Sequence, residues 1–359
     1  MAKNFSSKER CLTAFSHQQP DRVPIDYLYN PAIDRRLKAH FGLQSNDNER
    51  LRQALGVDFR AIEAPYIGPK LHADSSDIQV DNWGRRKKWV EHEWGGYWDY
   101  CDWPLQSADL ETIRRWPLPS PDDFDYQTIR RDSRKYEEYC VVVGHPGVPD
   151  IINSNSMLRT MEQVLVDLIT DDPAGLELID RSAQIWLEIM RRTLEAGEGR
   201  IDLLWLGEDL GTQRGPVISL DLYRKHIRPR HQKFVDLARE YQIATMIHSC
   251  GSSSWAFDDF VEMGIAVVDT LQPEAKNMQP AELKKRWGDK LCFHGMISTA
   301  GPLAYGTPAE VAADVRTTLD IMMPNGGYAL APTHDIQDNS PTENVVMMYK
   351  TAQEYGVYR

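Results

Sequence analysis

The sequence has few of the features that mark secreted or membrane proteins. Its 5 cysteines are an odd number among 359 residues and form no CxxC pair, so we expect no disulfide framework. No run approaches the roughly 18 apolar residues that a membrane-spanning helix needs, and the first residues lack the apolar segment of a signal peptide. These absences lead us to expect a cytoplasmic protein that is not attached to a membrane.

Basic residues are outnumbered by acidic ones, and the common nucleotide-binding motifs are absent. The chain has 41 Lys and Arg against 53 Asp and Glu, a formal net charge of −12, which argues against binding to nucleic acid. It contains no GxxxxGK[ST] loop, no GxGxxG after a strand and no HExxH. Nucleotide, dinucleotide and metalloprotease functions therefore have no support. A composition of 42% hydrophobic and 26% charged residues indicates a folded globular protein.

What the chain does have is a regular alternation of short apolar runs and amphipathic segments. The runs lie at 25–29, 57–62, 140–144, 201–206, 243–247, 265–269, 291–294 and 328–331. The helical segments lie at 7–15, 161–169, 174–194, 222–241, 308–323 and 341–355. Eight strands with interleaved helices predict an α/β fold, a closed (β/α)8 TIM barrel. We expect one domain over residues 1–359 with an N-terminal extension.

One stretch, residues 81–103, departs from this alternation because it is crowded with aromatic residues. Its rings are those of Trp83, Trp89, Trp94, Tyr97, Trp98, Tyr100 and Trp103, and glycines interrupt it. This composition predicts a β-hairpin inserted into the barrel. Two interpretations remain open: the rings pack an extension onto the core, or they form a lid over an apolar ligand.

Polar residues follow most of the predicted strands, and in a barrel the chemistry collects at those carboxyl ends. The residues at these positions are Asp26, Tyr27, Glu63, Tyr66, His145, Glu208, Asp209, His248, Cys250, Asp269, Gln272, His294, His334 and Asp335. From this region we predict that the substrate is contacted by Asp26, Tyr27, Tyr66, His145, Gln213 and Gln272.

The sharpest local motif is His248-Ser249-Cys250, at the end of the run 243–247. Side chains two apart on a strand point to the same face, so the imidazole and the thiol would both face the barrel mouth. Zinc prefers such ligands, and a catalytic zinc takes about three protein ligands and keeps an open position. Glu208 and His334 are the candidates for the remaining ligands. A buried cysteine beside a hydrogen-bonded histidine explains the same pattern without metal.

Several motifs taken together resemble the uroporphyrinogen decarboxylase superfamily over nearly the whole chain. In order they are Lys8-Glu9-Arg10, Pro20-Asp21-Arg22-Val23-Pro24, Glu208-Asp209-Leu210-Gly211-Thr212-Gln213, His248-Ser249-Cys250-Gly251 and Gly326-Gly327-Tyr328. The segments 332–337 and 341–344 look like the C-terminal strand and helix of its methyltransferase-like branch. The resemblance implies a (β/α)8 barrel and one of two chemistries, porphyrinogen decarboxylation or methyl transfer involving a corrinoid.

The resemblance itself argues against the haem-pathway reaction. True decarboxylases of the superfamily carry an Arg-Gln-Ala-Gly-Arg-Tyr segment soon after the first strand, whereas residues 27–34 contain no arginine and no glycine. A substrate with many carboxylates would then be buried unpaired, at a cost of several kcal/mol. We therefore reject this decarboxylation as the main function.

The methyltransferase branch implies zinc, bound by the HxC pair and a cysteine near the last strand. No cysteine follows Cys292, and the last strand offers His334 instead. The family's Gly-Gly-Ile-Asp segment is changed here to Gly295-Met296-Ile297-Ser298, which suggests a changed substrate. The resemblance implies a demethylase acting on a small methyl donor, with Asp209 or His294 passing a proton. The chain lacks the Asp-x-His-x-x-Gly motif, so a separate protein would supply the corrinoid (cobalamin).

Two further functions remain open. One is a decarboxylase or lyase in which Arg22, Arg85 or Arg214 holds a carboxylated substrate. The other is a ligand-binding barrel without catalysis, which would have no metal in its mouth. Relatives of this superfamily often pair, so a homodimer is left open as well.

Overall fold

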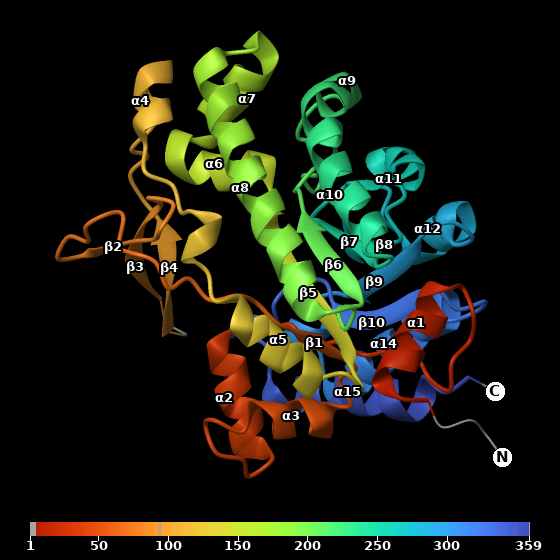
Figure 1. Cartoon of the computed structure of the whole chain (residues 1–359). Helices are drawn as coiled ribbons and strands as arrows, with labels where there is room; N and C mark the ends of the chain where they lie inside the picture. Colours follow the sequence, from red (N-terminus) through yellow and green to blue (C-terminus); the bar gives the residue numbers. More distant parts are fainter. Residues whose placement is uncertain (1–4, 93–94, 359) are drawn as a thin grey trace.

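The computed structural model describes residues 5–92 and 95–358. Its centre is a curled seven-stranded parallel sheet whose strands follow one another in chain order (Figure 1). The strands are β1 (Phe59–Ala61), β5 (Cys140–Pro149), β6 (Leu203–Gly207), β7 (Ala244–Ser249), β8 (Val267–Thr270), β9 (Cys292–Ile297) and β10 (Tyr328–Pro332). The fold is therefore α/β and resembles a TIM barrel.

Helices follow the strands and cover the outside of the sheet. Before β5 lie α1 (Ser7–Phe15), α2 (Pro31–His40), α3 (Asn48–Leu55), α4 (Leu110–Arg115), η1 (Pro121–Asp123) and α5 (Tyr126–Lys135). Between β5 and β8 lie α6 (Ile151–Arg159), α7 (Met161–Thr170), α8 (Pro173–Gly197), α9 (Leu220–Leu222), η2 (Tyr223–Ile227), α10 (Arg228–Glu240), η3 (Ser254–Ala256) and α11 (Phe257–Met263). After β8 lie α12 (Pro280–Trp287), α13 (Pro302–Tyr305), α14 (Pro308–Met322) and α15 (Thr342–Tyr355). None of the described helices is both long enough and apolar enough to cross a membrane.

The segment 24–30, which contains the run 25–29 expected as the first strand, lies between the two edge strands of the sheet. Asp26 N donates to Leu330 O at 2.9 Å, and Leu330 N donates to Pro24 O at 2.8 Å. On the other side, Asp58 N donates to Ile25 O at 2.8 Å. The contact with Leu330 is an isolated bridge and the contact with Asp58 is a single hydrogen bond, so neither side forms a ladder. The described sheet therefore has seven strands where the sequence predicted eight.

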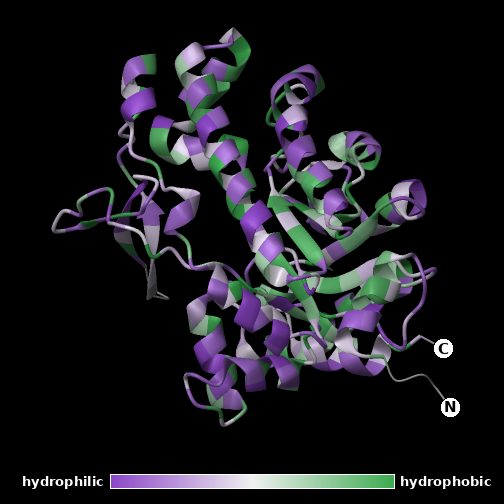
Figure 2. Cartoon of the chain, in the orientation of Figure 1, coloured by the Kyte–Doolittle hydropathy of each residue, from purple (hydrophilic) through white to green (hydrophobic). Residues whose placement is uncertain are grey.

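Two apolar layers lie on the two faces of the sheet. The inner layer includes Phe59, Val142, Trp205, Met246 and Val267, and Cys11 of α1 packs in the same cluster. The outer layer is larger and joins the other faces of the strands to the helices. In Figure 2 the strands are mostly hydrophobic and the helices are amphipathic, as this layering requires.

The aromatic stretch contributes β3 (Arg86–His92) and β4 (Gly95–Tyr100) to a small antiparallel sheet, which β2 (Ile78–Val80), just before the stretch, completes. The ring of Trp83 is stacked on that of Trp186 in α8, with centroids 5.2 Å apart. Trp83 is buried, whereas Trp89, Tyr97, Trp98 and Trp103 are exposed, and Trp94 lies outside the described residues. Trp83 therefore joins this segment to α8.

Candidate metal centre

Three polar side chains lie in a row on adjacent strands. The register pairs His248 of β7 with Asp269 of β8, and Asp269 with His294 of β9. Each of them lies two residues beyond an inner-layer residue, namely Met246, Val267 or Cys292. Because side chains two apart share a face of a strand, the row continues the barrel interior at its carboxyl end.

His248 and Cys250 lie together with Asp209, which follows β6. One ligand atom from each of the three lies within 4.8 Å of the others. Cys250 Sγ is 3.3 Å from His248 Nε2, and Nε2 is 3.7 Å from Asp209 Oδ1. A tetrahedral zinc ion with bonds of about 2.0–2.3 Å needs ligand atoms about 3.3–3.7 Å apart. The donor set and these two distances therefore fit zinc.

Neighbouring groups orient these ligand atoms. His248 Nδ1 donates to Asp269 Oδ2 at 2.7 Å, which leaves Nε2 facing Cys250 and Asp209. Cys250 N donates to Asp209 Oδ1 at 2.8 Å, and Asn153 Nδ2 donates to Oδ2 at 2.9 Å. A carboxylate behind a histidine is a common support for metal ligands, because it fixes the tautomer and raises the basicity of the ring.

Burial and hydrogen bonding have opposite effects on the pKa values of the side chains in this group. Burial disfavours the imidazolium of His248, but its hydrogen bonds to Asp269 and Cys250 outweigh burial and raise its pKa well above the usual value. Burial raises the pKa of the Cys250 thiol, against the effect of His248. The pKa of Asp269 is lowered despite its burial, because both imidazoles stabilise the carboxylate. Zinc needs the neutral imidazole and the thiolate, so binding it is coupled to proton release.

Glu208 does not lie with this group, although it precedes Asp209 directly. Its side chain is fully buried and accepts hydrogen bonds from Ile151 N at 2.8 Å and Ile152 N at 2.9 Å. His231 Nε2 lies 3.3 Å from the same carboxylate. The first N–H groups of α6 have no partner within the helix and attract this carboxylate. The geometry therefore replaces Glu208 by Asp209 as the candidate third ligand.

His334 is exposed on the loop after β10, and its Nδ1 lies 3.4 Å from Gln337 Nε2. It does not belong to the group formed by Asp209, His248 and Cys250, the one such group among the described residues. The structure thus brings together three candidate ligands, the number typical of a catalytic zinc with an open position.

His294 is fully buried, and both of its ring nitrogens contact carboxylates. Nδ1 lies 2.6 Å from Asp269 Oδ1, and Nε2 lies 3.2 Å from Asp26 Oδ2. Burial disfavours the imidazolium, but the two carboxylates raise the pKa of His294 to about 9. Neither nitrogen is available to a molecule in the mouth, so the geometry does not support the predicted proton transfer by His294. Asp26 is likewise engaged with His294 rather than open to a substrate.

Of the other predicted substrate residues, two lie beside the metal group. Gln272 Oε1 accepts a hydrogen bond from Gly251 N at 2.7 Å and lies 3.4 Å from Gln213 Nε2. Tyr27 is buried and stacks on Tyr29, with ring centroids 4.3 Å apart. Gln213 and Gln272 are therefore placed to contact a small molecule bound at the metal group. Tyr27 instead packs in the protein interior.

Tyr66 and His145 line a separate cavity of about 170 Å³, together with Phe124 and Trp186. Tyr66 Oη donates to Pro69 O at 2.7 Å, and His145 Nδ1 accepts from Gly147 N at 3.0 Å. None of the residues lining this cavity is a member of the candidate metal group. The structure does not place these two residues with the other predicted site residues.

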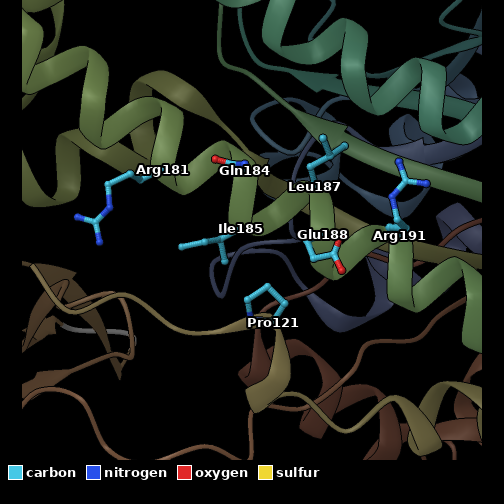
Figure 3. Close-up of a pocket in the computed structure, with 7 residues that line it drawn as sticks. All are labelled: Pro121, Arg181, Gln184, Ile185, Leu187, Glu188 and Arg191. Atoms are coloured by element: carbon cyan, nitrogen blue, oxygen red, sulfur yellow. The ribbon is translucent and has the colours of Figure 1, made fainter. Parts of the chain in front are cut away.

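A larger hollow, of about 510 Å³, lies along α8 rather than at the barrel mouth (Figure 3). Its lining residues are Pro121, Arg181, Gln184, Ile185, Leu187, Glu188 and Arg191. It contains none of the predicted site residues, so its size does not make it the functional site.

Sequence reasoning missed two residues that support the metal group. Asp269 was noted at a strand end but was given no role, and only the register places it between His248 and His294. Asn153 lies on α6, 56 residues before Asp209, and no sequence signal marked it. Both could be found only once the neighbouring elements were placed.

Comparison with known proteins identifies the family of this chain. The family model "Uroporphyrinogen decarboxylase (URO-D)" matches residues 107–355, more than half of the chain and all three candidate ligands. The chain belongs to the uroporphyrinogen decarboxylase family. Membership confirms the predicted resemblance, and it supports the prediction that the protein is an enzyme.

Two relatives of known function lie in the methyltransferase branch. This chain is 26% identical to a methylcobamide:CoM methyltransferase MtbA of Methanosarcina mazei, over 98% of both chains. It is 19% identical to the MtbA of Methanosarcina acetivorans, again over 98% of both chains. A solved structure described as a methyltransferase from Methanosarcina mazei has a TM-score of 0.64 and 17% identity, covering 98% of this chain and 99% of that one. That similarity shows a shared fold.

Proposed function

We propose that this enzyme transfers a methyl group between a small methylated molecule and a corrinoid, with the help of zinc. The observation that carries the proposal is the group of Asp209, His248 and Cys250, whose donor atoms have the spacing of zinc ligands. The names of the two MtbA relatives support methyl transfer with a corrinoid.

In this mechanism the three side chains hold the metal and Asp269 fixes the orientation of His248. Zinc bound there supplies a Lewis acid that stabilises negative charge on a thiolate or an ether oxygen. Gln213 and Gln272 lie beside the Cys250 loop and orient the molecule that approaches. The methyl group moves without its bonding electron pair, so the group that loses it keeps that pair.

The corrinoid in this proposal arrives on a separate protein that docks over the barrel mouth. The chain has no Asp-x-His-x-x-Gly segment of its own to hold a corrinoid. We also propose that residues 1–359 form one domain, in which 25–29 closes the barrel as its eighth strand and 81–103 is an insertion. The isolated bridge from Ile25 to Leu330 and the backbone hydrogen bond from Asp58 N to Ile25 O support closure. Pairing of the enzyme as a homodimer stays a prediction.

The lyase alternative loses one of its candidate arginines. Arg22 donates to both oxygens of Asp58, at 2.7 and 3.0 Å, and also to Gly56 O at 3.0 Å. These bonds occupy the guanidinium inside the protein, so it is not placed to hold a carboxylated substrate. No comparable observation favours a lyase over a methyltransferase.

Zinc content and methyl transfer test the proposed function together. We expect the purified protein to contain stoichiometric zinc by elemental analysis, and to demethylate methylcobalamin in the presence of a thiol such as coenzyme M. Cys250→Ser should lose both properties, because it removes the thiolate ligand. Cys101→Ser is the matched control, since Cys101 lies at the aromatic segment outside the metal group. A Cys250→Ser variant that keeps its zinc, or a zinc-loaded protein without methyl transfer, would contradict the proposal.

A further inference from the structure

Behind the metal group, four side chains form a continuous line that we call the carboxylate–imidazole chain: Asp26, His294, Asp269 and His248. The successive contacts measure 3.2 Å, 2.6 Å and 2.7 Å. Its members come from the segment 24–30, β9, β8 and β7, so it crosses the mouth from the junction of the sheet edges to the metal group.

The centre of this chain is closed to solvent. Asp269 and His294 are both fully buried. The ring of Phe59 meets that of His294 edge-on at 5.5 Å, and the ring of Trp205 lies 6.5 Å from each of the two imidazoles. In such surroundings a hydrogen bond between charged groups is strong, and a polar group that loses its partner is costly. The carboxylate–imidazole chain therefore has few alternative side-chain arrangements of low energy.

The partners of His294 determine its protonation. An ionised carboxylate oxygen can accept a hydrogen bond but cannot donate one. Because Nδ1 faces Asp269 and Nε2 faces Asp26, both nitrogens carry a proton and the ring is an imidazolium. One oxygen of Asp269 is held by His294, which leaves the other oxygen fixed against His248.

We propose that His294 is a positioning residue for the metal centre, which holds the carboxylate of Asp269 in one orientation so that His248 directs Nε2 at the metal. Asp26 anchors the far end of the line and so couples the segment 24–30 to metal affinity. This inference rests on the proposed function, because it requires that Asp209, His248 and Cys250 bind zinc. It assigns His294 no contact with substrate.

The test measures the zinc affinity of the full-length protein. The metal is first removed, and the protein is then titrated with zinc in the presence of a competing chelator. His294→Asn should weaken zinc binding by about 10- to 100-fold, the range found when outer partners of ligating histidines are removed. With cobalt(II) as the probe, the same variant should shift the visible bands that report ligand geometry. The matched control is His226→Asn, another buried histidine paired with a carboxylate, Asp171, outside the metal group.

Asp26→Ala is the second variant and serves if His294→Asn does not fold. Its carboxylate is partly exposed, so folding should tolerate its loss, and zinc binding should weaken by about tenfold, the lower end of the same range. This inference would be overturned if a folded His294→Asn or Asp26→Ala protein kept wild-type zinc affinity and an unchanged cobalt spectrum. The proposed function would not be affected by that result. Equal losses in His226→Asn would also overturn it, because they would show a general effect of removing buried histidines. A wild-type protein without zinc affinity would instead overturn the proposed function, and the inference with it.

Discussion

At the scale of single residues, Glu208 and Asp209 are adjacent acids with opposite surroundings. Glu208 points into the protein and binds the first N–H groups of α6, whereas Asp209 lies with His248 and Cys250. Which of two adjacent acids faces the mouth depends on where β6 ends and on where α6 begins. The sequence predicts that an acid lies there, but it cannot choose between the two.

Paired substitutions separate these two roles. Glu208→Gln should lower the free energy of unfolding by about 1–3 kcal/mol, because it weakens charge-assisted bonds to buried N–H groups, and should leave zinc affinity unchanged. Asp209→Asn should weaken zinc binding strongly and change the stability of the metal-free protein little, since Asp209 is only partly buried. Urea unfolding of the metal-free proteins and zinc titration provide the two measurements. The reverse pattern would restore Glu208 as the ligand.

The protonation of His294 predicts how stability depends on pH. The pKa of a free histidine is 6.5, and here it is raised to about 9, so protonation of this ring favours the folded state. That contribution, about 3 kcal/mol at 1.36 kcal/mol per pKa unit, is fully present below pH 6.5 and is lost as the pH rises through about 9. In the metal-free protein, the stability difference between wild type and His294→Gln should therefore shrink over this interval. A difference that stays constant from pH 6 to 10 would contradict the assigned charge.

At the scale of elements, α1 and the segment 20–25 are joined to β1 through one buried carboxylate. Asp58 is fully buried, and five hydrogen bonds reach its two oxygens. Their donors belong to Ser7, Arg10, Arg22 and the backbone of Ile25. Two of the motifs that carry the family resemblance, 8–10 and 20–24, thus join α1 and the segment 20–25 to the sheet.

Removing the charge of Asp58 tests this structural role. Asp58→Asn should destabilise the fold by about 3–5 kcal/mol, because it leaves buried arginine without its counter-charge. The comparable variant Asp21→Asn affects a more exposed partner of Arg10 and should cost about 1 kcal/mol or less. Urea unfolding gives both values, and the zinc affinity of the folded fraction should not change in either protein. Equal costs for the two variants would show that Asp58 has no special place in the network.

Periodicity predicted the elements better than it predicted their pairing. The expected helix 7–15 coincides with α1, and seven of the eight apolar runs coincide with strands of the sheet. The run 25–29 forms only bridges, since Pro24 and Pro31 flank it and a ladder requires backbone N–H groups that proline lacks. The last helix begins at Thr342 because Pro341 occupies its N-cap, one residue later than the sequence indicated.

At the scale of the whole molecule, the two ends of the curled sheet differ in character. Cys11 and Phe15 of α1 pack against the inner apolar layer below, while the row of His248, Asp269 and His294 lies above it at the carboxyl ends. The candidate chemistry is therefore confined to one mouth. The side-by-side placement of this row follows from strand register, which the sequence alone does not specify.

The aromatic segment 81–103 allows the two interpretations left open by the sequence to be distinguished. It is held to the barrel by the stacking of Trp83 on Trp186 and by a hydrogen bond of 3.0 Å from Trp116 Nε1 to Trp83 O. If its role is packing, Trp83→Ala should loosen this segment alone, because the lost contacts join it to α8. We expect faster limited proteolysis and hydrogen exchange within residues 78–100, with zinc affinity unchanged. The exposed Trp103→Ala is the control and should leave both rates near those of the wild type. A Trp83→Ala protein with slower methyl transfer but unaltered zinc content would instead favour a lid, since the segment would then act on the bound substrate.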